Sequence, residues 1–226
     1  GGGLAAAAAG GGGGGGGGDD AAPPPPPAPR PAAATVAHDK AVNAVDVSPD
    51  DALAATAGAD RTARLWSLPD LVPGAVLRGH KRGVWDVKFS PASRTVATAS
   101  GDATVRVWTV PDGACARALD GHGASVLRCA WAAGGSILAT VGADGLLKTW
   151  SARTGECSGT EDAHGAKAWA LDSADAGGGG GGAGAAGSHH PPSPGREAVL
   201  VTGGADGRLV LWRDRGAADA AAVASS

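Results

Sequence analysis

The chain has 226 residues, including 40 Gly and 15 Pro, and its formal net charge is −3. This near-neutral charge argues against a strongly basic nucleic-acid-binding domain, and no apolar run is long enough for a membrane span or a signal peptide. The three Cys have no CxxC spacing, so they indicate neither a disulfide framework nor a zinc site, and we expect a reducing, intracellular compartment. Because Met is absent, even at position 1, we expect a fragment or a processed piece.

Three segments are of low complexity. Residues 1–33 contain a run of nine Gly and a run of five Pro, residues 176–195 read AGGGGGGAGAAGSHHPPSPG, and residues 216–226 are rich in Ala and Ser. Such segments cannot bury enough apolar surface to offset their chain entropy, so we predict that all three are disordered. His189 and His190 lie in the second segment, where solvated side chains are expected more often than a metal site.

The region between these ends, residues 34–215, contains a repeat of 42 residues. In the first three units a His precedes an Asp by 22 positions and a Trp by 28, and a Thr stands four before the Asp. In the fourth unit the Asp follows its His by 42, an excess of 20 that equals the length of 176–195. The four sets are His38, Thr56, Asp60 and Trp66; His80, Thr98, Asp102 and Trp108; His122, Thr140, Asp144 and Trp150; and His164, Thr202, Asp206 and Trp212.

Each unit reads as four short antiparallel strands. After the His comes an apolar strand such as VNAVDV or VWDVKF, then a strand of small residues that carries the Thr. The Asp lies on a turn into the Trp strand, and a short fourth strand leads to the next His. We therefore predict four units at about 38–66, 80–108, 122–150 and 164–212, joined by the fourth strands, with 176–195 as an insert in the last.

This pattern resembles the WD-repeat β-propeller family over roughly residues 34–214. The resemblance implies an all-β fold, here a partial propeller of four blades with four antiparallel strands each. It also implies that the His, Thr, Asp and Trp of each blade form a hydrogen-bonded tetrad with a structural role. The family's Trp-Asp dipeptide is absent at the end of each unit, since Ser, Thr, Ser and Arg follow the four repeat Trp.

The sequence predicts no enzyme. Identical catalytic sites in every repeat would be unusual, and the Thr lies within a strand and not in a nucleophile elbow. No GxGxxG, P-loop or HExxH motif is present, so we expect no catalytic residue, cofactor, metal or small-molecule substrate.

Two Trp outside the tetrads are candidates for a binding surface. Trp85 and Trp169 each follow a repeat His by five, a region where WD-repeat proteins contact their ligands. They either pack between blades or anchor an interface. Lys81 and Arg82 follow His80 directly, within residues 61–117, which hold nine Lys or Arg against four Asp. Such a stretch is either a solvated face or a contact for RNA or an acidic partner.

Within the family, the phrases AHDK, DRTARLW, RGVW and ASVL are similar to a transducin-beta-like WD-repeat subunit of the U3 small nucleolar ribonucleoprotein, part of the small-subunit processome. The resemblance implies a scaffold in pre-18S rRNA processing and a nucleolar location in the nucleus. Its expected partners are other WD-repeat processome subunits and, mostly indirectly, U3 small nucleolar RNA and pre-rRNA, with no membrane. A generic WD-repeat adaptor, such as a G-protein β-like scaffold or a ubiquitin-ligase substrate receptor, remains the alternative.

Overall fold

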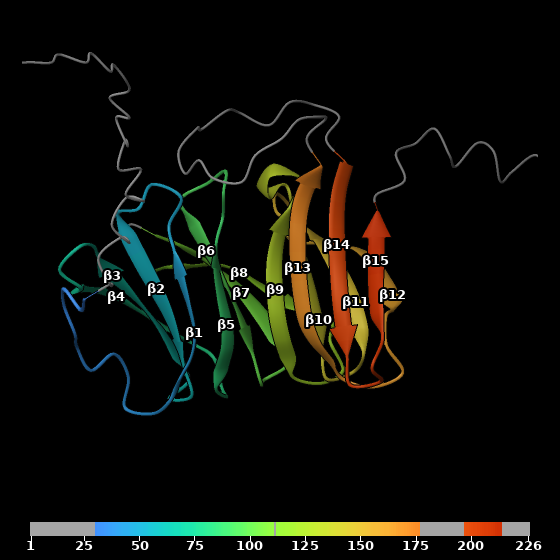
Figure 1. Ribbon diagram of the computed structural model, residues 1–226, viewed down its shortest axis with the longest axis horizontal. Helices are drawn as coiled ribbons and strands as arrows, with labels where there is room; N and C mark the ends of the chain where they lie inside the picture. Colours follow the sequence, from blue (N-terminus) through green and yellow to red (C-terminus); the bar gives the residue numbers. More distant parts are fainter. Residues whose placement is uncertain (1–29, 111, 177–196, 214–226) are drawn as a thin grey trace, which may run out of the picture. The chain divides into compact units, whose positions relative to one another are not determined.

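The computed structural model describes residues 30–110, 112–176 and 197–213 (Figure 1). Most of 1–33 and of 176–195, and all of 216–226, lie outside this description, so the predicted disorder of these three segments stays a prediction. His189 and His190 lie outside it as well. The blades belong to one compact unit, Ala32–Ser226.

Four antiparallel sheets follow one another along the chain, each pairing its strands in sequence order. Blade 1 contains β1 (Val42–Val47), β2 (Leu53–Gly58), β3 (Thr62–Ser67) and β4 (Val72–Arg78). Blade 2 contains β5 (Val84–Phe89), β6 (Thr95–Ser100), β7 (Thr104–Thr109) and β8 (Cys115–Asp120). Blade 3 contains β9 (Val126–Ala132), the 3₁₀ turn η1 (Ala133–Gly135), β10 (Ile137–Gly142), β11 (Leu146–Ser151) and β12 (Cys157–Asp162). Blade 4 contains β13 (Ala168–Ala176), β14 (Glu197–Gly204) and β15 (Leu209–Arg213).

The predicted all-β fold of repeated blades is confirmed. The fourth sheet differs from the expectation of four strands, since three are described and the chain after Arg213 lies outside the described residues. Strand β13 also extends three residues past the predicted AWALDS segment, because it pairs with β14 through Ala176 and Glu197.

The turn that carries each Asp explains how the chain reverses between the second and third strands. The residue after the Asp has a positive φ in every blade, from 68° to 77°. Glycine adopts this left-handed conformation without strain, and blades 3 and 4 place Gly145 and Gly207 there. Blades 1 and 2 place Arg61 and Ala103 in the same conformation, which is less favourable for a residue with a Cβ.

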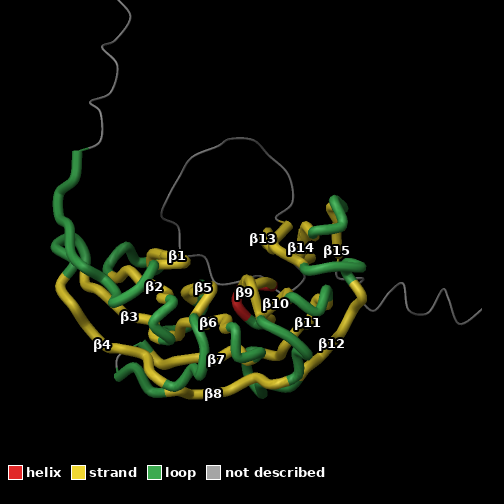
Figure 2. The backbone as a smooth tube through the Cα atoms, turned by 90° about the horizontal axis from the view of Figure 1, so that it is seen from below, coloured by secondary structure: helices red, strands yellow, loops and turns green. Residues whose placement is uncertain are grey.

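Each sheet has two faces that pack against different neighbours. We call the face that carries the tetrad Thr and Trp the tetrad face, and the opposite one the plain face. Trp108 and Phe89 on the tetrad face of blade 2 pack with Leu65 and Leu77 on the plain face of blade 1. Blades 2 and 3 and blades 3 and 4 form clusters of the same kind. The first strands β1, β5, β9 and β13 contact one another in turn (Figure 2).

Candidate functional site

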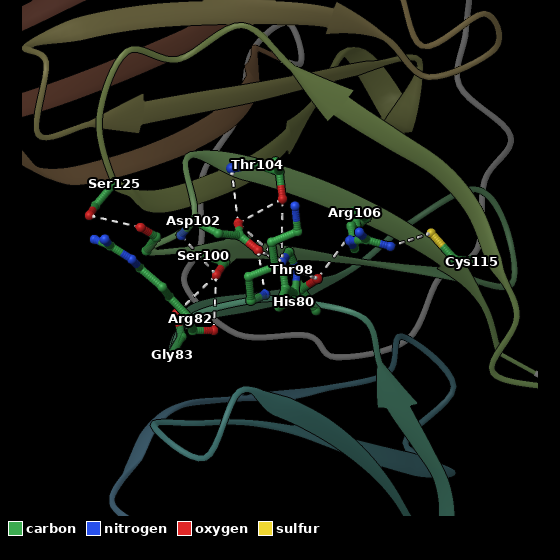
Figure 3. A network of polar contacts seen from close by, with 12 residues as sticks. His80, Arg82, Gly83, Thr98, Ser100, Asp102, Thr104, Arg106, Cys115 and Ser125 are labelled. Atoms are coloured by element: carbon green, nitrogen blue, oxygen red, sulfur yellow. Dashed lines mark hydrogen bonds and ion pairs between the residues drawn. The ribbon is translucent and has the colours of Figure 1, made fainter.

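In blade 2 the structure brings the four repeated side chains into one hydrogen-bonded chain, of which Figure 3 shows His80, Thr98 and Asp102. His80 Nδ1 lies 3.0 Å from Asp102 Oδ2, and His80 Nε2 lies 2.8 Å from Thr98 Oγ1. Trp108 Nε1 donates to Thr98 Oγ1 at 2.8 Å. A carboxylate only accepts, so we assign the imidazole proton to Nδ1, and Nε2 then accepts from the Thr hydroxyl. Each polar group of this buried set has a partner.

The other three sets form the same chain of hydrogen bonds. In each contact the closest donor and acceptor atoms are 2.8 to 3.0 Å apart. This includes the fourth set, in which His164 and Asp206 are 42 residues apart. In every blade the tetrad therefore joins the loop before the first strand to the second strand, the third strand and the turn between them.

Hydrogen bonds also fix the charge state of the tetrads. Burial raises the pKa of Asp60, but the stronger combined effect of hydrogen bonds from Thr62 and His38 lowers it to about 2. The pKa of Asp102 is likewise lowered, because hydrogen bonds from the Lys81 N–H and Thr104 outweigh its burial. Burial lowers the pKa of His80 despite the opposing effect of Asp102. The second tetrad therefore holds a carboxylate and a neutral imidazole at pH 7.

This arrangement has no reactive nucleophile. The Thr98 hydroxyl is fully buried, accepts from Trp108 and faces His80, so no substrate can reach it. The geometry supports a structural role, because the tetrad ties the second and third strands of a blade to the loop before its first strand with satisfied buried polar groups.

The sequence analysis did not predict the hydrogen bonds that join neighbouring blades. Asp46 Oδ2 accepts from the Phe89 N–H at 2.7 Å, and Asp86 Oδ2 accepts from the Cys129 N–H at 3.0 Å. Asn43 Nδ2 donates to the Val84 carbonyl at 2.7 Å. Burial raises the pKa of Asp86, opposite to the tetrad carboxyls. These residues do not recur at one repeat position, so periodicity gave no signal for them.

The four candidate interface residues are all exposed at the ends of the blades where the repeat His residues lie. Trp85 and Trp169 have 41% and 52% of their surface exposed, so they are not buried between blades. Five of the seven Trp donate their indole N–H to a partner within the chain, whereas Trp85 and Trp169 find no acceptor among the described residues. Lys167 Nζ lies 5.6 Å from the Trp169 ring centroid. We call the surface of Lys81, Arg82, Trp85, Lys167 and Trp169 the His-end surface.

An open hollow of about 480 Å³ lies beside this surface, between the end loops of blades 2 and 3. Its lining includes Lys81, Arg82 and Asp102, and its other residues are Gly, Ala and Ser. Gly101 lies against the side chains of Arg82 and Trp85. A Cβ at position 101 would lie 3.0 Å from the indole nitrogen of Trp85. The positive charge of 61–117 is not one patch, however, since Arg94 lies at the opposite end of blade 2, beside Ser90 and Pro91.

Within 30–110, 112–176 and 197–213, no group of three or more His, Cys, Asp or Glu is placed to hold a metal ion. Over the same residues, no helix has the length and apolar character that a membrane span needs.

Repeated antiparallel blades that carry the same tetrad and stack face to face define a β-propeller architecture. The family described as WD domain, G-beta repeat matches residues 31–67, 71–109 and 113–151, about half of the chain. The chain therefore belongs to the WD-repeat family. The match ends before blade 4, which the shared tetrad identifies as a further blade. No curated protein matches the chain.

Proposed function

We propose that this chain is a non-enzymatic scaffold that binds partner proteins through the His-end surface. The observation that carries this proposal is the pair Trp85 and Trp169. Both indoles are half exposed and have no acceptor for their N–H in the described part of the chain, whereas the other five are satisfied. Trp is the residue type most often responsible for binding energy at protein interfaces, where its ring is buried and its N–H bonded.

We further propose that the scaffold acts in the small-subunit processome, in pre-18S rRNA processing within the nucleolus. The support is the similarity of AHDK, DRTARLW, RGVW and ASVL to the processome subunit family. Charge favours docking through proteins, because the net charge is −3 and the basic residues of 61–117 are divided between the two ends of the blade. Contact with U3 RNA is then mostly indirect, since direct binding would need several phosphate contacts.

Purification of the tagged full-length protein tests this proposal. It should recover U3 RNA and processome subunits, and its depletion should lower 18S rRNA but not the large-subunit rRNA. Recovery of G-protein or ubiquitin-ligase partners, with U3 RNA at background, would support the alternative adaptor instead.

Charge reversal then tests the surface itself. Lys81→Glu with Arg82→Glu should reduce partner recovery without unfolding blade 2, because both side chains are exposed. The matched control is Arg94→Glu with Arg153→Glu, which makes the same charge change at the opposite ends of blades 2 and 3. Equal losses in both double variants would argue against a specific His-end surface.

A further inference from the structure

A groove crosses the contact of blades 1 and 2, at the end of the blades opposite to the His-end surface. It consists of two hollows, of about 190 and 250 Å³, that share Leu53, Arg94 and Val110 in their lining. The first hollow lies between the loops that follow β1 and β5, and the second extends to Gly74 and Ala75 on β4. We call the two hollows together the blade groove. Its walls belong to two blades that share one core, so the groove is part of an internal blade contact (Figure 2).

At the next contact, between blades 2 and 3, the equivalent space is occupied. Arg117 stands in blade 2 where Ala75 stands in blade 1, and its guanidinium donates to the Arg153 carbonyl of blade 3. Nearer the first strands, Gly135 lies so close to Pro91 that a Cβ at position 135 would be 3.2 Å from the proline ring. A long side chain and a tight turn therefore close this second contact, whereas the small side chain of Ala75 leaves the first one open.

The first hollow combines apolar side chains with loops that are already fixed. Phe89 and Leu53 supply apolar surface to its lining. In the loop after β1, Ser48 Oγ accepts from the Leu53 N–H at 2.9 Å, and in the loop after β5, Ser90 Oγ accepts from the Ser93 N–H at 3.2 Å. A preformed hollow needs little reordering to bind a ligand, and this one has room for one large apolar side chain.

Two charged residues, Arg94 and Asp50, line the first hollow. Asp50 Oδ1 accepts from the Ser48 hydroxyl and from the Ala52 N–H, so its own loop already holds this carboxylate. Arg94 is exposed on the wall that both hollows share, and its guanidinium has no ion pair within the described residues. The guanidinium is therefore free to pair with the carboxylate of a ligand.

We propose that the blade groove binds an extended segment of a partner protein in which a large apolar residue stands two positions from an Asp or Glu. Residues two apart point to the same side of an extended segment and lie roughly 7 Å from each other. The apolar side chain enters the first hollow beside Leu53 and Phe89, and the carboxylate accepts from the Arg94 guanidinium. The segment continues outward over Ala75 in the second hollow.

This binding is independent of the partners proposed for the His-end surface. The two surfaces lie at opposite ends of the blades, so a substitution in the groove should leave the recovery of His-end partners unchanged. Failure of either proposal therefore leaves the other standing.

Selection of random short peptides displayed on phage, with the whole 226-residue chain as the target, tests the proposal. The selected peptides should share an apolar residue two positions from an Asp or Glu. Synthetic copies with a fluorescent label then give Kd values by anisotropy. In these peptides, replacement of the apolar residue by Ala or of the acidic residue by its amide should weaken binding about tenfold.

Variants of the chain locate the site. Arg94→Glu should weaken binding about tenfold or more, and Ala75→Leu should weaken it without any change of charge. Arg153→Glu is the matched control, because it makes the same charge change at the same end of blade 3, and it should bind like the unmodified chain. Lys81→Glu with Arg82→Glu should also bind normally. Circular dichroism of every variant checks that the sheets are retained.

Several results would overturn the proposal. One is a selection that yields no peptide, or only peptides whose binding is the same in Arg94→Glu and in the unmodified chain. Another is a set of groove-binding peptides with apolar residues and no acidic one. Dimers of the chain that disappear in Arg94→Glu, measured by light scattering, would identify a second copy as the occupant instead.

Discussion

Blades 2 and 4 carry the same tetrad in different surroundings. Blade 2 has neighbours on both faces, and Trp108 is 1% exposed. Blade 4 has a neighbour only on its tetrad face within the described chain, and Trp212 is half-buried beside a hollow of about 420 Å³. The hydrogen bonds from the indole N–H to the Thr hydroxyl are 2.8 and 3.0 Å long, so the tetrad geometry is kept in both blades while the burial of the Trp differs. The same substitution should therefore cost less in blade 4.

The largest difference is expected for the Trp. Trp108→Ala should lower the free energy of unfolding by about 3–5 kcal/mol, because it leaves a cavity between two blades. Trp212→Ala should cost about 2 kcal/mol, because less of its surface is buried. Urea unfolding at one fixed protein concentration measures both. Equal losses would show that the surroundings of the tetrad do not matter.

A smaller difference is expected for the tetrad Asp. Asp102→Ala should cost about 1–3 kcal/mol, because the buried His80 Nδ1–H and the Lys81 N–H lose their acceptor. Asp206→Ala should cost less, since the side chain of Asp206 is 17% exposed against 7% for Asp102. Thermal melts of the two variants, with Asp102→Asn as the isosteric control, compare the effects. A larger loss in Asp206→Ala would contradict this order.

Acid should weaken the tetrads. The pKa of Asp60, Asp102, Asp144 and Asp206 is lowered on folding, so their contribution is complete above the unfolded value of about 4 and is lost as pH falls toward 2. The pKa of His80 and His122 is lowered by burial, so stability also falls as pH drops below about 6.5.

Asp86, between the blades, has a raised pKa, and its protonation opposes this trend. The urea midpoint measured from pH 7 to pH 2 should fall throughout. Its decrease between pH 4 and pH 2 should be smaller in Asp60→Asn than in the unmodified chain. If the urea midpoint of that variant fell between pH 4 and pH 2 by as much as that of the unmodified chain, the lowered pKa of Asp60 would be contradicted.

The smallest effect is expected for the insert of blade 4. Deletion of 176–195 should leave the melting temperature nearly unchanged, because the other three blades make the same connection without these residues. Each doubling of a loop changes the closure cost by only about 0.6 kcal/mol. A large loss of stability in calorimetry would mean that the insert contributes contacts of its own.

The repeat could be recognised in the sequence because the tetrads need the same four side chains at the same offsets in every blade. The alternation of VWDVKF and the small residues of VATAS gave the strands, and the 20-residue excess placed Asp206 in register with Asp102. The bonds of Asp46 and Asp86 could not be found in this way, because each depends on which backbone N–H the next blade presents. For the same reason, the sequence could not decide whether Trp85 and Trp169 pack between blades or stay exposed. Leu127 at the equivalent position of blade 3 is 5% exposed, so position in the repeat does not decide exposure.

The two half-exposed indoles, Trp85 and Trp169, also provide an intrinsic fluorescent reporter. Five Trp donate their N–H within the protein, whereas Trp85 and Trp169 meet solvent on the His-end surface. Iodide in solution should quench the emission of these two rings first, since it reaches only exposed fluorophores. A partner that covers them would shield their emission, so occupancy of this surface can be followed without any attached dye.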